Sequence, residues 1–468
     1  MTMDSTGFEV VVAAAWLPDP LAAPRWRDGS RNACHILRSL VASHDGAWVA
    51  PAGMGEWPGM RAGVRVEPVS TEDETLDDFL FGQCEGTLGP LYLDAGTAPE
   101  FRREWRQAYR SVNRRVAATV ARCAAPDAAV WVHDLHLQLV PGYLRELRPD
   151  LRIGLFFDGR FPDPERFLSE PLRDEIIGSL LDADVLGFQQ RRSALHFSAV
   201  ADLCRPYGPV PAIGVYSRGV DVPGIEALAR HPAVLRASGG VRAGLGNPGA
   251  VLLSVGHAAQ NQGSYRLLEA YTELLSEGTI DPAETTLMHV SICGDDPTHL
   301  RCDRARLDRR IAQINGVFGT IGRPAVHYVH RELAPGDMVA LYLSADVLLA
   351  LPLQDGTTVP AKEYVTARAG ATGRVVLSEF SGSTSDLAEA DIVNPHDIDA
   401  VKGAIERAVR HAASHADIPD AGMARMRHRV VRSDATAWAQ GFLATIRAAR
   451  PRSGVSHTID AEVGGLFR

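Results

Sequence analysis

The sequence predicts an α/β protein with two Rossmann-like domains that face each other across a cleft. Short apolar runs typical of buried parallel strands alternate with segments of helical periodicity. This pattern is built twice, since a stretch rich in Gly, Ala and Pro at residues 224–249 separates two such series. The length of 468 residues also exceeds what one ordinary core accommodates, so more than one domain is expected.

The expected elements follow in chain order. The first series predicts strands at Glu9–Ala15, Ala47–Pro51, Ala129–His133, Leu151–Phe157 and Val185–Phe188. The second predicts strands at Val251–Val255, Thr286–Ile292, Ala325–Val329, Asp346–Leu351, Val375–Ser378 and Asp391–Val393, followed by a helix at Asp434–Ala449. We therefore expect one domain at residues 1–235, a second at 236–432, a final helix within 433–450 that packs back on the first domain, and a mobile tail at 451–468.

Composition excludes several classes of protein. A net charge of -9 argues against nucleic-acid binding, and no apolar run reaches the roughly 18 residues that a membrane span needs. The first apolar run, Val10–Leu17, follows Asp4 and Glu9 instead of a basic segment, so it predicts a strand and not a signal peptide. Six cysteines without paired spacing indicate reduced thiols in a cytoplasm and no zinc site.

One stretch in the second half carries most of the chemistry. The predicted strand 346–351 runs into a polar turn at 355–358 and then into a helix with Pro360 in its first turn. Such a turn directs backbone N–H groups toward the carboxyl edge of the sheet, where they can hold an anion. The helix also carries Lys362, and the chain has only one other lysine, Lys402. A lysine at this place in so arginine-rich a chain indicates either a functional role or an exposed helix position.

Several stretches, taken in order along the chain, are similar to one known family. They are Val130–Leu137, Arg152–Phe157 with Phe161–Pro162, Asp184–Gln189, Val215–Tyr216 with Gly219–Asp221, Ile314–Gly316, Asp355–Gly356, Ala361–Tyr364, Ser378–Gly382 and Val393–Pro395. Together they resemble the trehalose-6-phosphate synthase family of glycosyltransferases. The resemblance covers most of the chain between about residues 100 and 445.

The resemblance implies a metal-independent, retaining glycosyltransferase with the fold called glycosyltransferase B-type. Family members move glucose from a nucleotide sugar to glucose 6-phosphate, with the donor against the second domain and the acceptor against the first. No cofactor is implied, because the nucleotide sugar is a co-substrate. The chemistry needs no protein nucleophile, since the protein supplies orientation and electrostatics. A homo-oligomer is compatible with the resemblance.

Carried over position by position, the resemblance also implies a set of site residues. Glu363 would accept hydrogen bonds from the nucleotide ribose, and Asp134 would contact sugar hydroxyls. The catalytic candidates are Asp134 and Asp355. The donor-binding candidates are Gly356, Thr357, Thr358, Val359, Lys362, Glu363, His257 and Gln262. The candidates for the acceptor or the cleft are Asp158, Arg160, Arg31, Phe188 and Gln189.

The chain departs from the family where the family binds phosphate. Family arginine, glycine, aromatic and histidine positions match Ala13–Ala15, Ser30–Asn32, Leu80, Gly89, Asp158 and the surroundings of Gly294. The arginine and lysine that hold the donor diphosphate match His257 and Gln262. Losing two hydrogen bonds to a charged group would cost about 3 to 6 kcal/mol, or about two to four decades of affinity. Either other cations take over or the substrates differ.

Other candidates have two interpretations each. Arg31 and Arg160 lie in loops that lost family residues, and we hypothesise that one of them restores an anion contact; the alternative is a solvated surface arginine. Asp158 is a candidate general base or a turn-forming residue before Gly159. His133 and the nearby His136 suggest a metal site only weakly, since no third ligand is evident, and the alternative is a structural role at the end of the strand.

The sequence therefore favours a glycosyltransferase with altered donor and acceptor phosphate sites that serves a specialised pathway. Two alternatives stay open. One is an ordinary trehalose-6-phosphate synthase with rearranged phosphate contacts, and the other is a catalytically silent homologue that acts as a binding partner. Asp134, Asp355 and Glu363 favour an enzyme, because a scaffold has no need of carboxylates in a cleft.

Overall fold

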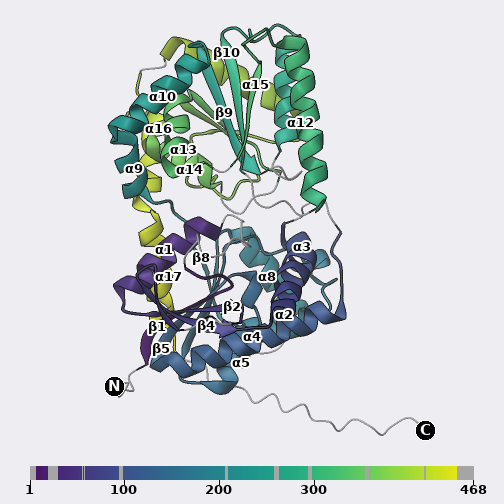
Figure 1. The fold of residues 1–468 in the computed structure, drawn as a ribbon, viewed down its shortest axis with the longest axis vertical. Helices are drawn as coiled ribbons and strands as arrows, with labels where there is room; N and C mark the ends of the chain where they lie inside the picture. Colours follow the sequence, from purple (N-terminus) through teal and green to yellow (C-terminus); the bar gives the residue numbers. More distant parts are fainter. Residues whose placement is uncertain are drawn as a thin grey trace, which may run out of the picture.

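The chain folds into two lobes, each built on one mainly parallel sheet (Figure 1). The computed structural model describes residues 7–18, 30–54, 56, 58–93, 98–205, 209–257, 263–292, 298–331, 333–353, 358–415 and 418–450. The predicted tail at 451–468 lies outside these ranges. Within them, no helix combines the length and the apolar character needed to cross a membrane. The α/β prediction with two Rossmann-like domains is confirmed.

The first lobe contains a sheet in the order β3-β4-β2-β1-β5-β6-β7-β8, parallel except for the β3/β4 hairpin. Its strands are β1 (Phe8–Ala14), β2 (Ala47–Ala52), β3 (Gly59–Arg61), β4 (Val64–Ser70), β5 (Ala124–His133), β6 (Arg152–Phe157), β7 (Val185–Phe188) and β8 (Ala212–Val215). The hairpin turns at Ala62 and Gly63, which both have positive φ, as a tight two-residue turn requires. The sequence missed β3, β4 and β8 because none of them is a continuous buried run.

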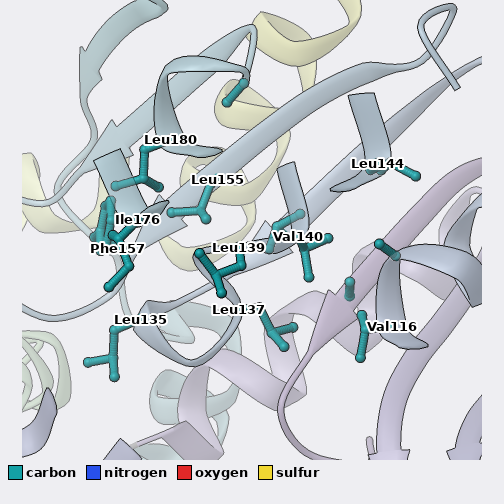
Figure 2. Close-up of a cluster of buried hydrophobic side chains, with 14 of the residues drawn as sticks. Val116, Leu135, Leu137, Leu139, Val140, Leu144, Leu155, Phe157, Ile176 and Leu180 are labelled. Carbon is teal, nitrogen blue, oxygen red and sulfur yellow. The ribbon is translucent and has the colours of Figure 1, made fainter. Parts of the chain in front are cut away.

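Helices cover both faces of this sheet. They are α1 (Ser30–Ser43), α2 (Asp73–Asp77), the π-helix η1 (Asp78–Leu88), α3 (Gly89–Leu93), α4 (Arg103–Cys123), the 3₁₀ turn η2 (Leu135–Leu137), α5 (Val140–Leu147), α6 (Pro164–Phe167), α7 (Arg173–Leu181) and α8 (Arg191–Cys204). Alternate strand residues face opposite sides: Val130 joins the core under α4 and α5, while Trp131 joins the core on the other face. Figure 2 shows part of the first core, with Leu155 of β6 near Ile176 and Leu180 of α7.

The second lobe repeats this architecture with the strand order β11-β10-β9-β12-β13-β14, all parallel. Its strands are β9 (Ala250–His257), β10 (Thr285–Ile292), β11 (Val326–His330), β12 (Val347–Ala350), β13 (Arg374–Ser378) and β14 (Asp391–Val393). Its helices are α9 (Val222–Arg230), α10 (Pro232–Gly244), α11 (Ser264–Ser276), α12 (Thr298–Phe318), α13 (Pro335–Ser344), α14 (Val359–Ala367), α15 (Ile398–His415) and α16 (Ala421–Arg432). Most of the Gly-, Ala- and Pro-rich stretch is thus helical, in α9 and α10.

The last helix, α17 (Ala435–Ala448), returns to the first lobe. Trp438 and Phe442 pack edge-on against Trp131, at ring distances of 5.4 and 4.7 Å. Gly154 of β6 and Gly187 of β7 permit this close approach, because a Cβ at either position would collide with α17 side chains. Residues far apart in the sequence therefore complete one core.

Two connections join the lobes. The first is residues 216–221, between β8 and α9, and the second is Ser433–Asp434, between α16 and α17. They touch one another: a Cβ at Gly219 would lie 2.1 Å from the carbonyl carbon of Asp434. The Ala435 N–H also donates to the Val220 carbonyl at 3.0 Å. The connections are thus packed as a pair.

Candidate active site

Asp134 stands directly after β5, at the carboxyl edge of the first sheet. Its backbone has φ 78° and ψ 177°, a combination that residues other than glycine adopt only under strain. Its carboxylate accepts hydrogen bonds from the N–H of Leu135 at 2.8 Å and of Asp158 at 3.2 Å. Such strain is typical of functional positions. Here the strained backbone and the two N–H donors hold a half-buried carboxylate in one position.

Asp158 occupies the corresponding place after β6. Gln189, which follows β7, donates from Nε2 to Asp158 Oδ1 at 2.7 Å. Arg218 of the first connection donates to Oδ2, and both side chains of this ion pair are nearly buried, at 7% and 11% exposure. These donors engage both oxygens of the carboxylate and hold it in place. The geometry therefore favours a held carboxylate over the general base that the sequence suggested as one interpretation.

Lys362 lies in the first turns of α14 and is completely buried. Its Nζ donates to Ser217 Oγ and to the Arg218 carbonyl, each at 2.9 Å, and lies 2.6 Å from Asp386 Oδ2. Burial lowers the pKa of this ammonium, and the Asp386 carboxylate opposes the shift. Because an ammonium has three N–H groups, these contacts use all of them. Lys362 therefore holds the first connection, and its predicted contact with the donor stays a prediction.

Glu363 and the start of α14 are fixed from within the second lobe. The Tyr342 hydroxyl donates to Glu363 Oε2 at 2.7 Å. Burial raises the pKa of Tyr342 most, and the negative charge of Glu363 raises it further. The Thr358 N–H donates to Ser383 Oγ at 3.2 Å. Val359, also a donor candidate, is the first residue of α14 and is partly buried. The turn after β13 thus braces the helix that carries the predicted donor contacts.

The remaining predicted residues divide into two groups. Asp355, Gly356, Thr357 and Gln262, and the side chains of Arg31 and His257, lie outside the described residues, so their roles stay predictions. Arg160 is half-buried in the loop after β6. Phe188 does not line a cleft: its side chain is fully buried, with its ring 5.2 Å from that of Phe157. It points into the core although its neighbour Gln189 reaches Asp158.

His133 has a structural environment. Its ring is completely buried, and Trp16 packs edge-on against it at 5.6 Å. Burial, reinforced by nearby Arg218 and His136, lowers its pKa to about 3. Neither ring nitrogen has a hydrogen-bond partner. Among the residues that the structure describes, no three His, Cys, Asp or Glu side chains gather in a way that could hold a metal ion.

Sequence reasoning missed several residues that shape this region: Ser217, Arg218, Tyr342 and Ser383. For Asp386 the sequence by itself indicates only a helix cap or a solvent-facing residue. For Ser217 and Arg218 a signal existed, because they interrupt a stretch whose flanking residues, Val215–Tyr216 and Gly219–Asp221, match the family. Tyr342 and Ser383 gave no comparable signal, since their partners lie far along the chain.

Two Rossmann-like lobes, each built on a mainly parallel sheet, form the GT-B fold of glycosyltransferases. The chain belongs to glycosyltransferase family 20, whose model matches residues 58–448. It is a glycosyltransferase of the trehalose-6-phosphate synthase type.

Similar proteins cover nearly the whole chain. The trehalose-6-phosphate synthase of Mycobacterium avium is 35% identical over 476 residues, which is 94% of each chain. That of Mycolicibacterium gilvum is 36% identical over 475 residues, covering 94% of this chain and 92% of the relative. Among solved structures, the E. coli protein bound with UDP-2-fluoro glucose has a TM-score of 0.84 at 25% identity. The match covers 95% of this chain and all of that one. An alpha,alpha-trehalose 6-phosphate synthase from Burkholderia multivorans has a TM-score of 0.83 at 25% identity, over 94% of this chain and 98% of that one.

Proposed function

We propose that this protein is an alpha,alpha-trehalose-phosphate synthase that transfers glucose from a nucleotide sugar to glucose 6-phosphate with retention of configuration. The observation that carries the proposal is identity of 35% across 94% of both this chain and its M. avium relative. Full-length similarity to a synthase favours the ordinary reaction over the specialised one that the substitutions at the phosphate positions suggested. The UDP-2-fluoro glucose held by the similar E. coli structure supports UDP-glucose as the donor.

In this proposal the protein acts by holding groups in place. Asp134, fixed by two backbone N–H groups, would contact sugar hydroxyls from the first lobe. Glu363, held by Tyr342, would accept hydrogen bonds from the nucleotide ribose in the second lobe. Fixing both reactants removes much of the entropic barrier to transfer, and oriented donors stabilise charge on the leaving diphosphate. At the start of α14 the Thr358 N–H donates to Ser383, the Ala361 N–H donates to the Thr358 carbonyl and Pro360 has no N–H, so the Val359 N–H is the candidate donor there.

Rearranged phosphate contacts are part of the proposal. Arg160, two residues beyond Asp158 in the loop after β6, is the described arginine closest in sequence to the replaced family histidine. An arginine fork binds phosphate in a bidentate manner, so one such contact compensates for part of the lost lysine and arginine contacts. Arg160→Met should then raise the KM for a phosphorylated substrate by about tenfold or more.

The experiment that tests the function measures nucleotide release and product together. The purified protein is incubated with UDP-, ADP- or GDP-glucose and with glucose 6-phosphate or unphosphorylated sugars, and the product linkage is read by NMR. Transfer to glucose 6-phosphate with α,α linkage supports the proposal. Transfer only to unphosphorylated acceptors would replace it with the specialised reaction. If the protein releases no nucleotide and calorimetry detects no nucleotide binding, it is a silent homologue.

A further inference from the structure

The first connection is held from both lobes at residues 217 and 218. On the side of the first lobe, Arg218 forms a nearly buried ion pair with Asp158. Gln189 donates to the same carboxylate, and the Asp158 N–H donates to Asp134 Oδ1 at 3.2 Å. Arg218 thus reaches the strained carboxylate at the centre of the candidate site through one intervening residue.

On the side of the second lobe, the same two residues bind α14. Lys362 Nζ donates to Ser217 Oγ and to the Arg218 carbonyl, each at 2.9 Å. Ser217 Oγ in turn donates to Asp386 Oδ2 at 2.7 Å. Glu363, the predicted ribose contact, is the next residue of that helix. One short segment therefore contacts the supports of both predicted substrate sites.

The first connection packs directly against the second. Gly219 packs against the backbone of Asp434 without room for a Cβ, and the Val220 carbonyl accepts from the Ala435 N–H at 3.0 Å. A change in the angle between the lobes must therefore be absorbed near this point. The side-chain contacts of Ser217 and Arg218 lie directly beside it.

We propose that Arg218 is a positioning residue that couples the donor-side helix α14 to the acceptor-side carboxylates Asp158 and Asp134. The coupling runs through its guanidinium on one side and its backbone carbonyl on the other, so the residue fixes the distance between the two substrate sites. This inference rests on the proposed function for its kinetic consequence. Asp158 stands where the family has a histidine, and Arg218 interrupts a matching stretch, so the ion pair belongs to this chain's own version of the site.

A buried ion pair away from the candidate site provides the control. Arg145 and Asp184 form such a pair in the first lobe, with 4% and 1% exposure and a distance of 2.7 Å. Asp184 precedes β7, at the opposite edge of the sheet from Gln189, which follows the same strand. The two pairs are therefore matched in burial and chemistry but differ in their distance from the candidate site.

The experiment compares Arg218→Met and Arg218→Lys with Arg145→Met and Arg145→Lys, all checked for folding by circular dichroism. Arg218→Met should lower kcat by about 10- to 100-fold, because a displacement near 1 Å suffices for that loss, while UDP affinity measured by calorimetry changes less than about threefold. Arg218→Lys should recover part of kcat. Arg145→Met should lower Tm and leave kcat unchanged. If it fails to fold, Arg145→Lys replaces it.

Two results would overturn the inference: an unchanged kcat in Arg218→Met, or an equal loss of kcat in a folded Arg145 variant. A second measurement needs no turnover. Small-angle X-ray scattering should give a larger radius of gyration for Arg218→Met than for the parent or the Arg145 variants, and an identical profile would contradict the coupling. If the parent transfers no sugar, the proposed function fails while scattering still decides the coupling.

Discussion

The strained backbone at Asp134 leads to a prediction that separates stability from activity. Asp134→Gly and Asp134→Ala both remove the carboxylate, so both lose the acceptor for the N–H groups of Leu135 and Asp158. They differ only at Cβ. With φ 78° and ψ 177°, a residue that has a Cβ costs about 1 to 3 kcal/mol, and glycine avoids this cost.

The expected difference follows from two opposing effects. Glycine loses about 0.5 to 1 kcal/mol more conformational freedom on folding than alanine does. Subtracting this from the strain leaves Asp134→Gly more stable than Asp134→Ala by on the order of 1 kcal/mol. Sugar transfer should fall by at least about a hundredfold in both variants, because neither retains a group that can bind sugar hydroxyls.

Urea unfolding followed by tryptophan fluorescence measures the stability difference, and nucleotide release measures the activity. The two unfolding curves should have equal slopes and different midpoints. Asp134→Asn is the control, because its amide oxygen can still accept from the backbone N–H groups. An alanine variant as stable as the glycine variant would refute the strain, and an active alanine variant would refute the role of the carboxylate.

Three other perturbations test separate features. Gly219→Ala should destabilise the protein by about 1 to 3 kcal/mol in urea unfolding, because its Cβ would meet backbone atoms at 2.1 to 2.4 Å. Gly441→Ala in α17 should instead stabilise the protein by about 0.5 to 1 kcal/mol, because a Cβ there meets nothing within 4 Å. Equal effects of the two substitutions would contradict the packing of Gly219. Tyr342→Phe should raise the donor KM by about tenfold through loss of its hydrogen bond to Glu363, with little change in acceptor KM; an unchanged donor KM would argue against this support. His133 has a folded pKa of about 3 against 6.5 in the unfolded chain, so it costs no stability above pH 6.5 but lowers the free energy of unfolding as pH falls toward 3, by up to about 1.4 kcal/mol per pH unit. A His133→Phe variant should show a flatter dependence of unfolding free energy on pH over that window, and a parallel curve would contradict the assignment.

The fold was largely predictable because parallel strands covered on both faces are continuous apolar runs. Strands such as β9 and β12 were found for this reason, whereas β8 was missed because most of its residues are exposed. The stretch 224–249 was interpreted as a separator between two series of elements. It is mostly helical in α9 and α10, where Pro232 occupies the first turn, a position that tolerates proline.

The site was predictable where it depends on local sequence and unpredictable where it depends on distant partners. Asp134 and Glu363 follow from the resemblance alone. Lys362 was singled out as a donor contact, and its partners at 217, 218 and 386 come from other elements, which no local pattern indicates. For Phe188 the error is one of direction, since adjacent residues at the end of a strand point to opposite sides.

The placement of α17 has a consequence for how the protein is made. Every strand of the first sheet lies before residue 216, yet the helix that covers Trp131 and Phe156 begins only at residue 435. During synthesis the part of this sheet face around Trp131 and Phe156 therefore stays uncovered until the second lobe has left the ribosome, although α1 already covers its other part. A nascent chain truncated before residue 435 should bind chaperones or aggregate, whereas the complete chain shields that face itself.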